Sequence, residues 1–406
     1  MRSGDGLVAA DDLPDAARAA VGDALVPLDG AAPDLVAVFV VGDDPDDNAA
    51  ALRAAHLTAV AAGARTTIGA SAVGVVGAGR AVTDGPAVAA WAGVLPGARV
   101  RSFHLEVLRA REAWAVVGMP VPREDDVVGL LLADPWSFPA EGFVGAAGGP
   151  TGALSLVGGM AHGPNGAGST RLMVDGVLHE RGAVGTVLAG VDAGALVNPG
   201  HRPFGPPMTV TGVLGTVVAE LAGAPASEQL AAAVAALDAE DRALARHGVM
   251  LGVAVDEYVD DHGTDELVVR SILDVDDERG CFETPDPIPV GTTVRFCLLD
   301  PDHASAQLSD GLLGLRRDHR AAPFEGALLV ACADRYAQAD DVLEGDVRSL
   351  RRVLGAQGVA GMLAGGEIGP SPKGNQLHGL SATVLALSGS DEIVLDRGVR
   401  EASARG

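Results

Sequence analysis

The sequence predicts a mixed α/β fold, of the α+β kind, built from repeated β-α-β-β units that pack as two related domains. Three segments share the spaced pattern Gly-x-x-Ala-x-Gly-x-x-Gly, and they begin at Gly69, Gly158 and Gly361. An apolar, strand-like run precedes each pattern at nearly the same distance. These runs cover residues 35–41, 127–133 and 327–333. Self-similarity of this kind indicates one structural unit used three times.

The first two units follow the same predicted order. In the first, a helix is expected after Asn48 as N-cap and is closed by Gly63, and a strand over 87–95 follows the pattern. In the second, a short helix is expected over 141–146. A hairpin there turns at Asp175-Gly176, and a strand over 183–189 closes the unit.

An insertion of a different kind precedes the third unit. It opens with the Pro/Gly-rich stretch 198–207, expected to be a loop, and continues into an Ala-rich helical stretch over 227–248. Three strands with turn residues between them indicate an antiparallel meander. They are expected over 249–255, 267–273 and 293–299, and residues 302–322 are expected to form a helix and a loop. The third unit then has a helix near 346–354 and a last strand over 380–387.

The expected domain organisation has four parts. They are an N-terminal extension over 1–32, a first domain over 33–215 with units one and two, a second domain over 216–390 with the insertion and unit three, and a tail over 391–406.

The composition excludes several classes of protein. A net charge of −25 and the lack of a long basic cluster argue against nucleic acid and anionic membranes as partners. The three cysteines form no CxxC pair, which favours a reducing compartment. The N-terminal segment does not resemble a signal peptide, and no apolar run is long enough to span a membrane. We therefore expect a cytoplasmic protein.

The strongest polar constellation lies in the third unit. Glu367 stands inside the glycine pattern, Lys373 and Asn375 follow in the next loop, and His378 leads into the last strand. A Gly-rich bend brings backbone N–H groups and a carboxylate close together, as in a site for a small zwitterion. The aligned positions Val75 and Pro164 of the other units carry no charge. The alternative is that Glu367 pairs locally and His378 is a structural residue at a strand end.

Other polar residues allow two interpretations each. Arg202 lies in a proline-stiffened stretch, where its guanidinium suits a carboxylate or phosphate, or ties the insertion to its neighbour. Cys332 ends a strand, as a nucleophile or as an inert buried thiol. Lone histidines such as His104 show no metal-ligand spacing, so no metal site is predicted.

These segments resemble the FIST family, whose members carry FIST N and FIST C domains. The resemblance rests on runs 33–36, 205–211 and 255–258, and above all on 365–370 with Asn375 and 377–379. It implies a bacterial sensory module of signal transduction that binds a small ligand, with amino acids as proposed ligands and heme in some members. Similar proteins commonly have a cysteine and a carboxylate in the first unit, where this chain has 70–74, Ala-Ser-Ala-Val-Gly. Of the Cys-Asn-Gly-Arg-Gly stretch common in FIST C domains, only Cys332 and Arg335 are kept.

Three functional hypotheses follow. The first is a small-ligand sensor with a site at Arg202, Cys332, Arg335, Glu367, Asn375 and His378, which signals through a separate protein such as a histidine kinase or cyclase. The second is an enzyme that uses Cys332, Glu367, Lys373 and His378 on a small polar substrate. The third is a heme-binding nitric oxide sensor, with His378, His104 and His201 as axial candidates. No cofactor is expected, because the chain has few aromatic residues to line a heme pocket.

Overall fold

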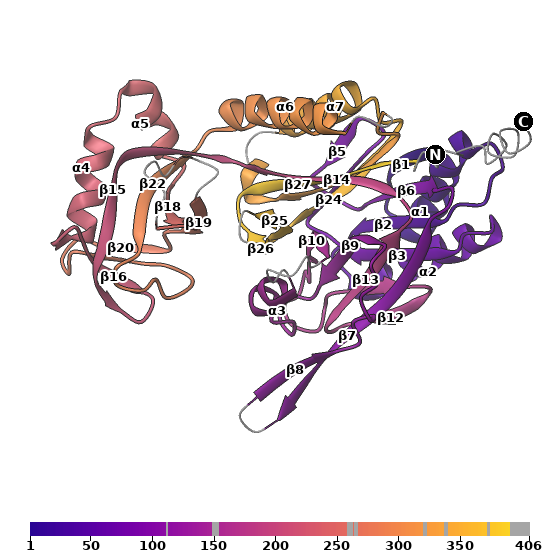
Figure 1. Ribbon diagram of the computed structural model, residues 1–406, viewed down its shortest axis with the longest axis horizontal. Helices are drawn as coiled ribbons and strands as arrows, with labels where there is room; N and C mark the ends of the chain where they lie inside the picture. The colour runs from indigo at the N-terminus through magenta and orange to yellow at the C-terminus, as the bar shows by residue number, and fades with distance from the viewer. Residues whose placement is uncertain are drawn as a thin grey trace, which may run out of the picture.

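The chain folds into a body of three sheets and an inserted domain built on a fourth sheet. The computed structural model describes residues 1–110, 113–147, 154–257, 263, 267–319, 323–336, 340–371 and 374–389. The inserted domain stands to one side of the body and is reached through β14 and β15 (Figure 1). The mixed α/β class and the repeated units predicted from the sequence are confirmed.

The first unit occupies the N-terminal quarter of the chain. Asp12 and Asp44 cap its two helices by accepting hydrogen bonds from the backbone N–H groups of Asp15 and Asp46. The second helix therefore begins earlier than the expected cap at Asn48. The elements are β1 (Arg2–Ala9), α1 (Leu13–Leu25), the 3-10 helix η1 (Val26–Leu28), β2 (Leu35–Val41), α2 (Pro45–Ala61), β3 (Thr66–Ser71), β4 (Gly74–Gly77), β5 (Arg80–Val82) and β6 (Ala87–Val94).

The second and third units repeat this order with different connections. The second consists of β7 (Arg99–Ala110), β8 (Ala113–Val117), β9 (Asp126–Ala133), α3 (Ala140–Ala147), β10 (Ser155–Met160), β11 (Leu172–Val174), β12 (Val177–His179) and β13 (Ala183–Ala189). The third consists of β14 (Asp192–Pro199), α6 (Pro301–Asp318), β23 (Gly326–Cys332), the 3-10 helix η3 (Asp334–Tyr336), α7 (Asp340–Leu354), β24 (Gly358–Ala364), β25 (Glu367–Ser371), β26 (Gly374–His378) and β27 (Ser381–Ser388).

Each unit contributes a hairpin to the sheet of another unit. The β4–β5 hairpin of the first unit pairs with β24 of the third, β11–β12 of the second pairs with β3 of the first, and β25–β26 of the third pairs with β10 of the second. The first sheet has the order β1-β6-β2-β3-β11-β12, the second β26-β25-β10-β9-β13-β7-β8 and the third β14-β27-β23-β24-β4-β5. The exchange is cyclic, so no unit completes a sheet by itself.

The first glycine of each pattern has the same structural role. Gly69, Gly158 and Gly361 lie in β3, β10 and β24, where they pair with Val38, Leu131 and Leu329 of the parallel neighbouring strands. A Cβ at Gly158 or Gly361 would lie 1.8 Å from the carbonyl oxygen of Leu131 or Leu329, so only glycine fits there. These glycines mark the close approach of parallel strands in the repeated unit.

The sequence alignment of the units is wrong after the third pattern position in the second unit. Val75 and Glu367 pair with Met362 and Gly159, which hold equivalent places in β24 and β10. In the first sheet the residue that pairs at this place is Leu172, opposite Ala70, rather than Pro164. The loop that joins β10 to β11 is longer than the corresponding loops of the other units, and Pro164 lies in it.

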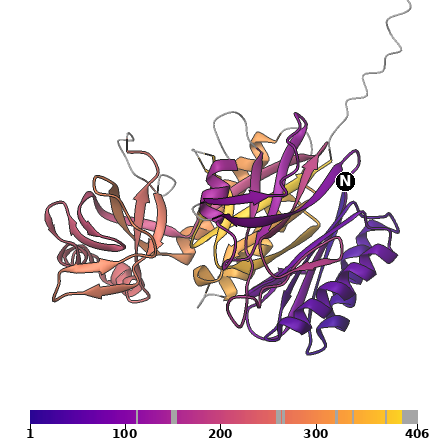
Figure 2. The ribbon, with the colours of Figure 1, turned by 90° about the horizontal axis from the view of Figure 1, so that it is seen from below.

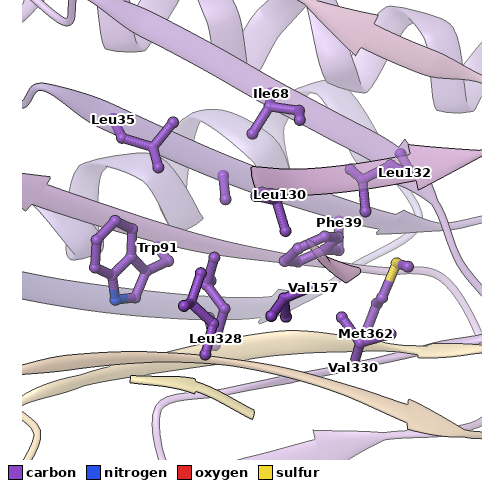
Figure 3. Packing of buried hydrophobic residues seen from close by; sticks show 14 of the residues in the cluster. Leu35, Phe39, Ile68, Trp91, Leu130, Leu132, Val157, Leu328, Val330 and Met362 are labelled. Atoms are coloured by element: carbon purple, nitrogen blue, oxygen red, sulfur yellow. The ribbon is translucent and has the colours of Figure 1, made fainter. Parts of the chain in front are cut away.

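One core joins the three sheets. Alternate residues of β2 divide between two cores: Leu35 and Phe39 face the centre of the body, while Val36 and Val38 face α1 and α2. Figure 3 shows that central side chains of all three sheets meet, with Trp91, Leu130 and Leu328 among them. The helices cover the outer faces, as α1 and α2 do in Figure 2. Strands buried on both faces explain the continuous apolar runs in the sequence.

The inserted domain has an eight-stranded sheet in the order β19-β18-β22-β15-β16-β21-β20, with β17 beside β16. The stretch expected to be a loop is strand instead: β15 pairs with β22, and the register shifts between Phe204 and Met208, where Pro206 and Pro207 fall. A bulge tolerates proline because the ladder is interrupted there. The elements are β15 (His201–Leu214), β16 (Val217–Leu221), β17 (Ala224–Pro225), α4 (Ala226–Ala235), α5 (Ala239–Ala245), β18 (Val249–Ala254), β19 (Leu267–Ser271), β20 (Asp274–Asp276), β21 (Cys281–Glu283) and β22 (Thr293–Leu299).

Two further predictions concern the chain ends. Residues 2–28, within the expected N-terminal extension, form β1, α1 and η1 of the first unit. The expected tail over 391–406 lies outside the described residues. In the part of the chain that the structure describes, no helix is long and apolar enough to cross a membrane.

Candidate functional site

Glu367 is the buried centre of the candidate site. It begins β25 directly after Gly366, and its register partner across the hairpin is His378, so both side chains leave the same face. The side chain is fully buried. Its Oε2 accepts hydrogen bonds from the backbone N–H of Ser381 at 3.1 Å and from the Ser381 hydroxyl at 2.7 Å. Among the described residues, Oε1 has no hydrogen-bond partner.

The surroundings favour the neutral form of this carboxyl group. Burial raises the pKa of Glu367 to about 8, against the lowering effect of the two hydrogen bonds from Ser381 and of the Arg335 charge. The carboxylate of Asp334 raises this pKa further. At neutral pH most Glu367 side chains therefore carry a proton.

Cys332 lies beside Glu367 at the end of β23. Burial, together with the Glu367 carboxylate, raises the pKa of the Cys332 thiol to about 12. A nucleophilic cysteine needs a thiolate near neutral pH. The structure therefore favours the inert thiol over the nucleophile.

Arg335 is a buried tie between segments. It is 1% exposed and donates a hydrogen bond to the Asn198 carbonyl at 2.8 Å and another to the Asn198 side chain. Its guanidinium also lies 3.8 Å from the Asp346 carboxylate and stacks over the Tyr336 ring. These contacts join β14 to the segment after β23 and to α7, behind the cavity described next.

A cavity of ≈ 170 Å³ lies where the β25–β26 hairpin meets β19 of the inserted domain. Figure 1 shows this hairpin on the side of the body that faces the inserted domain. The polar side chains that line the cavity are His201, Ser371, Gln376, His378 and Ser381, and its apolar side chains are Val197, Pro199, Val255, Leu267, Val268, Val269 and Pro370. Ser381 separates the cavity from Glu367.

His378 is a neutral imidazole in this cavity. Burial lowers the pKa of His378, and its Nε2 lies 3.3 Å from the carbonyl oxygen of Gly369. If Nε2 carries the proton that this carbonyl accepts, Nδ1 is an acceptor. The buried His201 lines the cavity as well.

Two other predicted site residues do not reach this cavity. The Asn375 amide bonds to the backbone of Leu154 and Leu156 at 2.9 Å each, and it borders a separate hollow of ≈ 640 Å³. Arg202 forms ion pairs with Asp241 and, at 3.1 Å, with Asp300. These acidic partners hold Arg202 between α5 and the start of α6.

The predicted residues therefore divide into three groups. The structure brings His378 and His201 to the cavity, places Glu367, Cys332 and Arg335 behind it, and holds Asn375 and Arg202 away from it. Lys373 lies outside the described residues. Ser381, the link between Glu367 and the cavity, was missed from the sequence. In the sequence, Ser381 is marked only by its position after the His378-Gly379 pair. Its link to Glu367 can be recognised only when the register of the hairpin is known.

The three histidines predicted as axial candidates lie in two different settings. The His104 ring stacks on His179 with centroids 3.6 Å apart, and its Nε2 lies 3.2 Å from a carbonyl oxygen. His378 and His201 share a cavity of only ≈ 170 Å³, below the range of about 300–1,000 Å³ usual for drug-sized ligands. A heme beside His378 or His201 would need a larger, apolar space.

Comparison with known protein families identifies the domains of this chain. The chain matches the FIST N domain over residues 34–224 and the FIST C domain over residues 226–370. The two matched regions meet inside the inserted domain, between β17 and α4.

Curated relatives match over almost the entire chain. An uncharacterized protein of Mycobacterium bovis, Mb0898c, is 32% identical over 386 residues, 95% of this chain and 98% of that protein. Another of Mycobacterium tuberculosis, MT0656, is 32% identical over 388 residues, 95% and 99% of the two chains. FIST domains are associated with sensory signal transduction and small-ligand binding. With both of its domains matched and the glycine-patterned units in place, the chain belongs to the FIST family.

Proposed function

We propose that this protein is a cytoplasmic sensor that binds an amino acid or a similar small polar molecule in the ≈ 170 Å³ cavity beside His378. The observation that carries the proposal is the meeting of five polar side chains from three segments of the chain in one small cavity. A pocket with a few convergent polar groups and a group of perturbed pKa behind it is the usual form of a ligand site.

The size and lining of the cavity suit a small ligand with an apolar part. The hydroxyl groups of Ser371 and Ser381 and the imidazole of His378 offer donors and acceptors on the hairpin side. Leu267 and Val269 of β19 offer an apolar wall on the other side. An aliphatic amino acid presents both kinds of surface.

Glu367 gives the site a means of recognising a positive charge. Its carboxyl group is neutral near pH 7 and lies one hydrogen bond, through Ser381, from the cavity. An ammonium group in the cavity favours the ionised carboxylate, because an opposite charge lowers the pKa of an acid. Binding of an amino acid is then accompanied by release of a proton from Glu367.

The enzyme hypothesis is weaker for this site. The pKa of Cys332 near 12 keeps its thiol protonated, and a protonated thiol is a poor nucleophile. We therefore assign Cys332 and Arg335 a supporting role, with output through a separate signalling protein such as a histidine kinase or cyclase.

A thermal-shift screen of the amino acids and small polar metabolites tests the proposal. A ligand at 100 times its Kd stabilises the fold by about 2.7 kcal/mol. We expect a hit to lose this stabilisation in His378→Ala, whereas His247→Ala, an exposed histidine of the inserted domain, keeps it. Full stabilisation in His378→Ala would place the ligand elsewhere, and no stabilisation by any compound of the panel would contradict the proposed ligand class.

A further inference from the structure

A second hollow, of ≈ 490 Å³, lies at the corresponding end of the second unit. It is formed by β7, the loop after β9 and the turn before β13. Its lining residues are His104, Glu106, Val107, Arg109, Trp136, Ser137, Arg181 and Gly182.

The repeat relates this hollow to the cavity beside His378. His179 is opposite Leu172 in its hairpin as His378 is opposite Glu367, so the two histidines hold equivalent places. His104 and Val197 are also equivalent, because they pair with Val184 of β13 and Thr383 of β27, which in turn pair with Leu132 of β9 and Val330 of β23. In the first unit the equivalent residues are apolar and pack in the shared core. The second and third units thus each keep a hollow at one structural position.

The second hollow has an excess of positive charge. Arg109 and Arg181 are exposed on it, and in the described part of the chain no carboxylate forms an ion pair with either guanidinium. His104, whose ring stacks on that of His179, lines the hollow, and Glu106, whose side chain is 63% exposed, is its one acidic residue. Two arginines against one glutamate give the hollow a net positive charge in a chain of net charge −25. It favours an anionic ligand.

Trp136 adds a flat apolar surface to this charge. Its side chain is 58% exposed and lines the hollow beside the arginines. The loop that carries it is fixed by Ser137, which donates a hydrogen bond to buried Asp134 at 2.5 Å and accepts one from the Gly182 N–H at 2.8 Å. A fixed, exposed indole is a stacking platform for an aromatic ring.

We propose that the hollow between Arg181, Arg109 and Trp136 is a second binding site, for a small anion that carries an aromatic ring. The anionic group, a carboxylate or a phosphate, pairs with the guanidinium groups, and the ring stacks on Trp136. This site is separate from the cavity beside His378 and does not depend on the function proposed for it.

Isothermal titration with four probes tests the site: benzoate, phenyl phosphate, inorganic phosphate and the neutral benzamide. We expect benzoate or phenyl phosphate to bind at least tenfold more tightly than benzamide, and the preferred one of the two identifies the anionic group. Phenyl phosphate should also bind more tightly than inorganic phosphate. Equal binding of benzamide and benzoate, or no binding of either aromatic anion, overturns the proposal.

Variants assign the binding to these residues. Arg181→Gln should raise the Kd of the preferred probe at least tenfold, and Trp136→Ala should remove the preference for an aromatic over a simple anion. Arg53→Gln, an exposed arginine on α2, and His378→Ala at the other cavity should leave the Kd unchanged. An unchanged Kd in folded Arg181→Gln, or a loss in His378→Ala, would contradict the assignment.

Discussion

Replacing Glu367 with glutamine should change how the stability of the protein depends on pH. Burial raises the pKa of Glu367 from 4.5 to about 8. A carboxyl group that binds its proton more tightly when folded contributes stability below the unfolded pKa, and this contribution is lost as pH rises toward the folded pKa. Glutamine keeps the shape and can still accept from Ser381, but it does not titrate.

The expected size follows from the shift. The difference 8 − 4.5 is 3.5 pKa units, and at about 1.4 kcal/mol per unit the upper bound is about 5 kcal/mol. Arg335 already contributes to this pKa, and the interval from pH 5 to pH 8 spans most of the shift, so we expect up to about 3–4 kcal/mol across it. Glu367→Gln should therefore gain this amount relative to the parent protein as pH rises.

Urea unfolding at several pH values measures the effect. The free energy of unfolding of the variant minus that of the parent protein is plotted against pH from 5 to 9. The control is Glu240→Gln on the exposed surface of α5, for which the difference should stay flat. A difference for Glu367→Gln that is equally flat, within about 0.5 kcal/mol, would refute the raised pKa and the proton release proposed for ligand binding.

Three further predictions concern stability and cofactor content. Gly361→Ala should destabilise the fold by more than about 3 kcal/mol in urea unfolding, because the new Cβ meets a backbone carbonyl at 1.8 Å, whereas Gly314→Ala in α6, which meets nothing within 4 Å, should stabilise it by up to about 1 kcal/mol. Asn375→Leu should cost about 2–4 kcal/mol and speed amide exchange at Leu156 in β10, since the Leu156 N–H and the Leu154 carbonyl lose their partners; unchanged exchange would contradict this. The purified protein should show no Soret band, and near-stoichiometric heme that survives gel filtration would overturn that expectation.

Local patterns were enough to predict the repeated unit. The strands around Gly158 and Gly361 were found because parallel strands buried on both faces need apolar runs and leave no room for a side chain at the close approach. The hairpin at Asp175-Gly176 was found for the same local reason, since its turn chemistry lies in adjacent residues. These features depend on neighbours in sequence.

The exchange of hairpins and the composition of the site depend on residues far apart. Nothing near Asn375 in the sequence shows that its amide faces Leu154 and Leu156, more than 200 positions away. The sequence left open whether Arg202 binds a ligand or ties the insertion to its neighbour, because Asp241 and Asp300 are remote from it in the chain. Long-range pairing is fixed by the whole fold, so the sequence located the polar residues without assigning their partners.

The cyclic exchange of hairpins among the three units has a consequence for the growing chain on the ribosome. The β4–β5 hairpin emerges early, but its partner β24 is made almost 300 residues later. Until then an edge strand of the nascent protein stays unpaired, and such edges are prone to aggregate. Synthesis of β25 and β26 near the end closes the second sheet as well. The body should thus be completed only after nearly all of the chain has left the exit tunnel, and a release that stops short of β24 should yield a product for chaperones or proteases.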